Sequence, residues 1–441
     1  MLRKGSLTLW VVLFVLAPVL LLGTVPVRAD DHDEGRDRDK ERNQGAVRLL
    51  DTIPTPGSPL LAFDISWVNS HTRRYYLADR SNAAIDVIDT KDGTFLKQIH
   101  ASPPFRGFSG SNNTSGPNGV VVSGHWLFAT DASSRVVTID LRTDTTVSDV
   151  STGGKDSNRA DELAYDPEDG IILAVNNADD PPFATLISVD KNTGKLTVGK
   201  RITFDAADVG FDATNGAEQP VWDPGTGHFY LSIPEIDCPK ADPRCGGAFP
   251  DGAIAKISPN STGNVDAEFH VQLCQPAGLT LGPKQDLLLG CSVIFNTAGE
   301  AWTGLTDPNS AAPTQVIMDA KTGAIDKVVK GVGGSDEVWF NKGDGNYYTG
   351  SRENPGAVLI AGNTPADPVL GVIDADDQTL IQLVPTFDTP AASPAPRGSA
   401  HSVAVDSRNN HAFVPLPANN VFPNCLNGCV AVFGTSKEDH N

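Results

Sequence analysis

The sequence lacks sustained helical patterning, since no window keeps apolar residues on one helix face over three turns. It also lacks the short signatures of common enzyme classes. There is no Gly-x-Ser-x-Gly elbow, no His-Glu-x-x-His motif, no glycine-rich phosphate loop and no Cys-x-x-Cys pair. These absences exclude a mainly helical fold, and they mean that any functional site must be assembled by the fold from distant residues.

Positive charge is scarce as well. The chain has 34 Lys and Arg against 54 Asp and Glu, for a formal net charge of −20 at pH 7. Nucleic-acid binding is driven mainly by Lys and Arg that neutralise phosphates, so we expect no nucleic-acid partner. An acidic surface attracts cations instead.

Long apolar runs are absent except at the N-terminus. Two basic residues precede the apolar stretch 7–22, and residues 27–29 offer small side chains at the positions that a signal peptidase reads. The short length of the run favours a cleaved signal peptide over residues 1–29 and disfavours a membrane anchor. We therefore expect a secreted protein, extracellular or periplasmic, with no membrane span after cleavage.

The remaining chain divides into three parts. Residues 30–45 are nearly all charged or polar and show no apolar periodicity, which predicts a disordered segment. Residues 435–441 are expected to form a flexible tail. Between them no linker composition interrupts residues 46–434, which we interpret as one domain.

A repeated motif predicts the fold of this domain. Each copy opens with a polar residue, runs through a short apolar strand, turns, and enters a second strand. The copies begin at Asp64, Asn118, Glu162, Gln219, Ala277, Glu337 and His401. In several copies a third strand ends at an Asp-containing tight turn, twice with a following Thr-Gly, and a fourth strand follows. Four antiparallel strands per repeat without helices predict an all-β, seven-bladed β-propeller.

The two ends of the repeat array predict how the ring closes. The last repeat supplies only three strands and finishes at residues 429–433, whereas residues 46–53 form a strand ahead of the first repeat. Pairing these two segments removes an exposed sheet edge. We predict that the N-terminal strand completes the last blade.

Propeller geometry predicts where a site would lie. The inner strands begin at one mouth of the central channel, and the second strands return to the same face. This face gathers the residues that open the repeats and, from the ends of second strands, Asp131, Glu235 and Arg352. We expect the following residues to bind a ligand there: Asp64, Gln219, Asp131, Arg352 and Glu235.

The ring of repeat-opening residues supplies carboxylates, amides and one imidazole. Such an oxygen-rich set with one nitrogen suits calcium, magnesium or manganese, with calcium the first choice. The expected metal ligands are Asn118, Glu162, Glu337 and His401. The alternative is a hydrated channel in which water satisfies every polar side chain.

The repeats resemble those of YVTN-type proteins and of the senescence-marker and gluconolactonase group. One segment matches the gluconolactonase group more closely than the rest. It consists of Pro117-Asn118-Gly119, an apolar strand and then residues 128–131. In gluconolactonase-like enzymes a similar Pro-Asn-Gly segment carries an asparagine that binds the catalytic divalent cation, so the resemblance implies that role for Asn118. The Asp-Gly turn that is usual between those strands is replaced here by Ser123-Gly124-His125.

Six cysteines in an exported chain predict disulfides. Sequence proximity and repeat geometry favour the pairs Cys238 with Cys245, Cys274 with Cys291, and Cys425 with Cys429. All three pairs would brace loops on the channel-mouth face. Metal ligation by the thiols is the alternative.

Two functions follow from these features. The first is a lactonase-like, metal-dependent hydrolase in which a cation polarises a carbonyl and activates water, with His401, Glu162 and Glu337 as catalytic candidates. The second is a non-enzymatic secreted propeller that binds a small molecule, a carbohydrate or a protein on its upper face. In either case we expect a monomer with a small-molecule or extracellular ligand.

Overall fold

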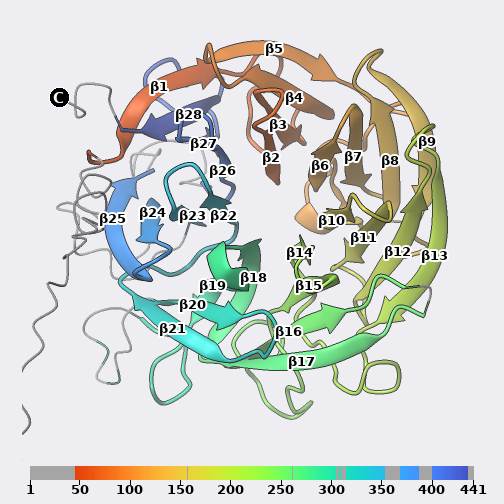
Figure 1. The fold of residues 1–441 in the computed structure, drawn as a ribbon, viewed down its shortest axis with the longest axis vertical. Helices are drawn as coiled ribbons and strands as arrows, with labels where there is room; N and C mark the ends of the chain where they lie inside the picture. The colour runs from red at the N-terminus through yellow and green to blue at the C-terminus, as the bar shows by residue number, and fades with distance from the viewer. Residues whose placement is uncertain are drawn as a thin grey trace, which may run out of the picture. The chain divides into compact units, whose positions relative to one another are not determined.

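Seven four-stranded antiparallel sheets form the blades of a ring in the computed structural model (Figure 1). The model describes residues 45–155, 157–260, 262–303, 307, 309, 314–352, 368–386 and 400–435. The predictions for residues 1–29, 30–44 and 436–441 concern positions outside this part of the chain. In the described part, no helix is long and apolar enough to cross a bilayer.

The blades follow one another in chain order, each with its first strand innermost. The first three are β2 (Ser66–Asn69), β3 (Arg74–Asp79), β4 (Ala84–Asp89) and β5 (Thr94–Ile99); β6 (Val120–Ser123), β7 (Trp126–Asp131), β8 (Arg135–Asp140) and β9 (Thr145–Ser151); and β10 (Leu163–Asp166), β11 (Ile171–Asn176), β12 (Phe183–Val189) and β13 (Leu196–Thr203). The next three are β14 (Pro220–Asp223), β15 (His228–Ile233), β16 (Asp251–Ile257) and β17 (Val265–Gln272); β18 (Cys274–Leu281), β19 (Asp286–Ile294), β20 (Thr314–Asp319) and β21 (Ile325–Lys330); and β22 (Val338–Asn341), β23 (Asn346–Ser351), β24 (Val369–Asp374) and β25 (Thr379–Pro385). The seventh blade combines β26 (Ala404–Asp406), β27 (His411–Leu416) and β28 (Cys429–Gly434) with β1 (Arg48–Pro54). The predicted seven-bladed, all-β fold is confirmed.

The tight turns form where the sequence predicts them. The Asp190 carboxylate accepts backbone N–H bonds from Asn192 at 2.9 Å and from Thr193 at 3.2 Å, and Gly194 then adopts a φ of +71°. Asp319 repeats this arrangement with the backbone N–H groups of Lys321 at 3.0 Å and Thr322 at 2.7 Å. A carboxylate that accepts such local bonds fixes the turn, and glycine takes the left-handed position at no steric cost.

The strands of a blade become more exposed from the axis of the ring outward. The whole of β7 is buried, whereas β9 alternates between exposed and half-buried positions. The core lies between neighbouring blades: Tyr76 and Val87 of the first blade pack with Val122 and Leu127 of the second. Every blade therefore needs a neighbour on each side to cover its apolar faces.

The N-terminal strand closes the ring as predicted. β1 pairs antiparallel with β28, from Arg48 opposite Gly434 to Pro54 opposite Cys429. Just before β1, the backbone N–H and C=O of Val47 bond the Gln382 side chain at 2.9 and 2.8 Å. The seventh blade is thus built from the two ends of the domain.

A buried carboxyl pair lies under the connection from β1 to β2. Asp79 and Asp86, on adjacent strands of the first blade, are both fully buried. Asn82 donates to Asp79 at 2.6 Å and to the Ser58 carbonyl at 3.1 Å. Gln98 donates to Asp86 at 3.0 Å. Side chains that hold the two carboxyls therefore also contact the connection that follows the closing strand.

Electrostatics makes this pair sensitive to pH. Burial raises the pKa of Asp79 to about 6, and burial together with the Asp79 carboxyl raises the pKa of Asp86 well above its ordinary value. One proton is thus retained in the folded state at pH values where the unfolded chain has lost it. This proton stabilises the fold at low pH, and the stabilisation is lost as the pH rises through the folded-state pKa values.

The three predicted disulfides are present. Cys238 pairs with Cys245, Cys274 with Cys291, and Cys425 with Cys429. The described cysteines leave no free thiol. The alternative of metal ligation by these thiols therefore does not apply to this structure.

We predict that the closing strand carries a large share of the stability. Deletion of residues 1–45 keeps Val47 and all of β1, so the melting temperature should match that of the chain that begins at residue 30. Deletion of residues 1–54 removes β1 and exposes β28, and should lower the melting temperature by on the order of 10 °C. Thermal melts followed by circular dichroism measure both, and equal melting temperatures for the two truncations would contradict the role of β1.

We further predict that Asp86→Asn stabilises the protein more at pH 7.5 than at pH 4.5. The amide resembles the protonated carboxyl and cannot be repelled by Asp79 when the pH rises. Because burial and the Asp79 carboxyl raise the pKa of Asp86, the gain should grow as the pH rises over this range. Melting temperatures at both pH values measure the trend. The exposed Asp92→Asn in the same blade is the control, and a gain that is independent of pH would disprove the prediction.

Candidate functional site

A cavity of about 630 Å³ lies at the end of the channel where the inner strands begin. It is lined mainly by charged and amide side chains. Its charged and imidazole residues are Asp64, Arg80, Arg159, Asp161, Glu162, Glu218, Asp336, Arg352 and His401. The volume falls in the range of small-molecule sites, but the polar lining suits a polar or charged ligand.

One side of the cavity is electrically balanced. The Arg80 guanidinium pairs with the Asp64 carboxylate, and Arg159 reaches the same carboxylate at 3.2 Å and Asp161 at 2.7 Å. Burial by itself would raise the pKa of Asp64, but Arg80 and Arg159 outweigh it and hold that pKa well below its ordinary value. Asp64 is thus ionised. Two guanidiniums face two carboxyls on this side, although burial raises the pKa of Asp161 to about 7 against the opposing effect of Arg159.

The opposite side carries an excess of carboxyls. Burial, reinforced by the Glu337 and Asp161 carboxyls, raises the pKa of Glu162 well above its ordinary value. Burial and the nearby Asp161 and Asp336 raise the pKa of Glu218 to about 8. On this side Arg352 pairs with Asp336 at 2.9 Å, and Arg159, already paired with Asp64 and Asp161, also acts to lower the pKa of Glu218. Carboxyls that crowd each other in a poorly hydrated place need a proton or a cation to offset their charge.

His401 joins the balanced side. Its Nε2 atom lies 3.6 Å from Asp64 Oδ1, and its ring stacks on Phe63 with centroids 5.0 Å apart. The imidazole lines the cavity as the sequence predicts.

Three other repeat-opening residues join neighbouring blades. Asn118 donates to the Ala160 carbonyl at 2.7 Å, Gln219 accepts from the backbone N–H of Leu279 at 2.7 Å, and Glu337 accepts from that of Val403 at 3.1 Å. None of the three lines the cavity. Their polar side chains hold one blade against the next at the mouth.

Asn118, for which the family resemblance implies a metal-binding role, contacts Arg80. Its Oδ1 atom accepts two bonds from Arg80, at 3.0 Å from Nε and 2.7 Å from Nη2. That oxygen therefore faces a buried guanidinium. The other predicted ligands, Glu162, Glu337 and His401, do not bring their ligand atoms within 4.8 Å of one another.

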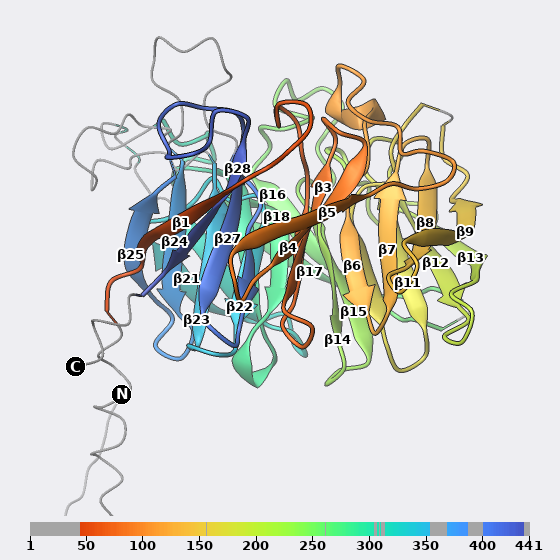
Figure 2. The ribbon, with the colours of Figure 1, turned by 90° about the horizontal axis from the view of Figure 1, so that it is seen from above.

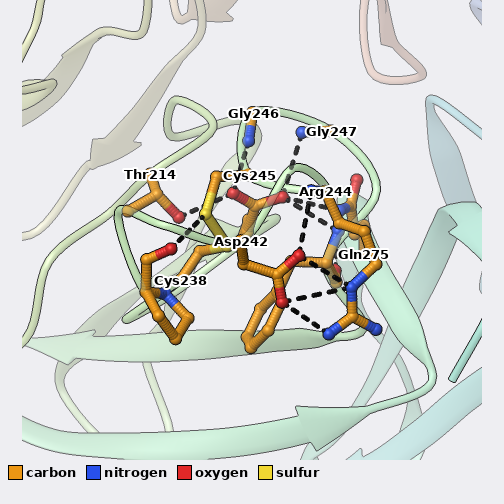
Figure 3. Close-up of a disulfide and its surroundings, with 11 residues drawn as sticks. Thr214, Cys238, Asp242, Arg244, Cys245, Gly246, Gly247 and Gln275 are labelled. Atoms are coloured by element: carbon orange, nitrogen blue, oxygen red, sulfur yellow. Dashed lines mark hydrogen bonds and ion pairs between the residues drawn. A yellow bond between two sulfur atoms is a disulfide. The ribbon is translucent and has the colours of Figure 1, made fainter.

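Asp131 and Glu235 lie outside the cavity lining and anchor loops. Asp131 accepts from the Arg106 backbone at 3.1 Å and pairs with Arg135 at 2.7 Å. Glu235 accepts from the backbone of Gly246 at 2.7 Å and of Gly247 at 2.9 Å, beside the disulfide in the same loop (Figure 3). Both carboxylates thus position the mouth connections.

The loop held by Glu235 forms part of the cavity wall. Thr214 donates to Glu235 at 2.7 Å and Gln275 donates at 3.2 Å, as Figure 3 shows. Gln275 and Gly247 line the cavity. One buried carboxylate, together with the disulfide between Cys238 and Cys245, therefore fixes the wall that the fourth and fifth blades contribute.

The sequence reasoning missed several lining residues by one position. Asp161, Glu218 and Asp336 precede the predicted Glu162, Gln219 and Glu337 directly. In each doublet the first residue bonds the end of its own second strand, for example Asp161 N–H to the Val175 carbonyl at 2.7 Å. The polar doublets were visible in the sequence. Arg80 directly follows the second strand that ends at Asp79, so the repeat pattern places it at the mouth, whereas Arg159 lies in a connection that the pattern does not mark.

A metal ion that the protein binds directly, without bridging water, needs several His, Cys, Asp or Glu ligand atoms close together. In the part of the chain that the structure describes, one group of three has ligand atoms within 4.8 Å of one another: Glu235, Cys238 and Cys245. Both of these cysteines are consumed by their disulfide. The mouth carboxyls in the described residues are therefore spaced too widely for three of them to contact one metal ion directly.

No protein-family model matches the sequence, and no curated protein matches it. Among solved structures, the chain is similar to the β-propeller domain of Cps50 (Swd1) from Myceliophteria thermophila, with 10% sequence identity and a TM-score of 0.54. The alignment covers 89% of this chain and all of that domain. At this identity the similarity establishes the propeller fold alone.

Proposed function

We propose that the protein is a binding propeller whose channel mouth takes up a divalent cation, with calcium first and magnesium or manganese as alternatives. The observation that carries the proposal is the unbalanced carboxyl-rich side of the cavity, formed by Glu162, Glu218 and Asp336 with Arg352 as their cationic neighbour. A divalent ion would offset the charge that Arg352, and Arg159 with its own two carboxylate partners, leave uncompensated.

The spacing of these carboxyls favours a partly hydrated ion. The described residues offer no three carboxylates close enough for direct coordination. Calcium and magnesium commonly complete their coordination with water, and the cavity of about 630 Å³ leaves room for it. Glu162 and Glu218 would then hold the ion directly or through one water layer.

Cation binding would be coupled to proton release. Burial and neighbouring carboxyls raise the pKa of Glu218 to about 8, so this carboxyl holds a proton at neutral pH. A bound cation favours the ionised form and displaces that proton. The affinity should therefore rise between pH 6 and pH 8.5.

The resemblance to gluconolactonase-like enzymes implies hydrolysis as a further possibility for this site. Asn118, the residue that it suggests, faces a guanidinium, and the catalytic candidates Glu162, Glu337 and His401 do not bring their ligand atoms within 4.8 Å of one another. We therefore derive no hydrolytic step, and binding is the function that the geometry supports best.

We also propose that the protein works outside the cytoplasm. Its three disulfides lie in or beside strands and connections of the fourth, fifth and seventh blades. Disulfides of this kind form and persist in oxidising compartments.

The test is a calcium titration by calorimetry and thermal melts at pH 6 and pH 8.5. At a free calcium concentration 100 times Kd, the folded state should gain about 2.7 kcal/mol, and a chelator should remove the gain. The double variant Glu162→Gln and Glu218→Gln should lose this response and should melt higher than wild type in chelator at pH 8.5, because it no longer buries repelling charges.

The matched control is Glu168→Gln, an exposed residue at the opposite end of the third blade. It should respond to calcium as wild type does. If calcium, magnesium and manganese leave the wild-type melt unchanged at both pH values, the hydrated-channel interpretation holds and the proposal is wrong.

A further inference from the structure

The connections at the mouth end expose large apolar side chains. Leu61 between β1 and β2 is 52% exposed, Phe108 between β5 and β6 is 54% exposed, and Val421 and Leu426 between β27 and β28 are 43% and 79% exposed. All three connections lie at the same end of the ring (Figure 2). Apolar side chains that gather on one face mark an interaction surface, and we call these four residues the apolar rim.

Hydrogen bonds tie these connections together. The Leu60 carbonyl accepts from Ala418 at 2.8 Å, and the Leu60 N–H donates to the Asn427 carbonyl at 2.9 Å. In the connection between β5 and β6, the Phe108 N–H donates to the Arg80 carbonyl at 2.8 Å. The apolar rim therefore runs over the seventh, first and second blades as one supported surface.

The most exposed part of the apolar rim is held in a fixed shape. The disulfide between Cys425 and Cys429 encloses Leu426, and Asn419 accepts from the backbone of Val421 at 3.0 Å and of Phe422 at 2.9 Å. A surface loop fixed in this way loses little conformational entropy when a partner binds.

The apolar rim borders the acidic cavity directly, because two of its residues, Leu61 and Phe108, also line that cavity. We propose that this end of the ring docks a peptide segment of another protein in which a lysine lies between apolar side chains. The apolar residues would cover the rim, and the ammonium group would enter the cavity toward Glu218 and Asp336. An ammonium carries three hydrogen-bond donors and the positive charge that this side lacks.

Charge selects this partner among the surfaces that an apolar rim could meet. The chain has a formal net charge of −20, which disfavours anionic membranes and a second copy of itself. The inference rests on the proposed function only in that it uses the same carboxyls; the apolar rim is an independent feature.

The test uses fluorescein-labelled Gly-Leu-Lys-Phe-Gly and Gly-Phe-Lys-Leu-Gly, with matched peptides in which Gln replaces Lys. Fluorescence polarisation should show binding of at least one Lys peptide at least tenfold tighter than its Gln counterpart. Phe108→Ser and Leu426→Ser should each weaken that binding at least fivefold. Glu218→Gln should weaken it as well, whereas Glu168→Gln should not.

Calcium titrations on the same variants separate the two proposals. Leu426→Ser and Val421→Ser lie outside the cavity and should keep the wild-type calcium response while losing peptide affinity. Failure of both Lys peptides to bind at about 1 mM, equal binding of the Gln peptides, or wild-type affinity in Leu426→Ser would each overturn the inference. Binding of phosphatidylserine vesicles, or concentration-dependent self-association, that is lost in Leu426→Ser would assign the rim to those occupants and would overturn it too.

Discussion

The ring depends on the contacts between neighbouring blades at the channel mouth. Each blade buries its apolar faces against two neighbours, so none is stable by itself. At the mouth, backbone bonds repeat around the ring, as from Ile65 N–H to the Asn118 carbonyl and from Glu337 N–H to the His401 carbonyl. Side chains of Asn118, Gln219 and Glu337 add further bonds between blades. The residues nearest the axis are therefore partly committed to holding the ring together.

This commitment explains which features of the site could be foreseen. Strand ranges, turns, the closing strand and the disulfide pairs follow from local patterns, such as the alternation of apolar residues and the Asp190 and Asp319 turns. The cavity lining depends on which residue of each polar doublet points into the channel. That choice is set by pairing with the second strand, and a shift of one residue reverses it. Hence Gln219 and Glu337 were predicted where Glu218 and Asp336 line the cavity, while at the doublet Asp161–Glu162 both residues line it and only Glu162 was predicted.

The charges of the mouth have two different roles. On one side, Arg80 and Arg159 neutralise Asp64 and Asp161 and connect loops that are distant in sequence. On the other side, burial and neighbouring acidic side chains keep the pKa values of Glu162 and Glu218 raised. The first network stabilises the structure without a ligand. The second retains protons that a cationic ligand can replace, which makes it the part of the mouth suited to binding.

Closure by β1 also has a consequence for biosynthesis. β1 leaves the ribosome before every other strand of the ring, and its partner β28 is the last strand of the ring to be made. During that time the first strand has no place in a finished sheet, and the first and sixth blades lack one neighbour each. The nascent chain therefore presents open sheet edges and uncovered apolar faces until β28 emerges, and it is in this interval that chaperone protection matters most.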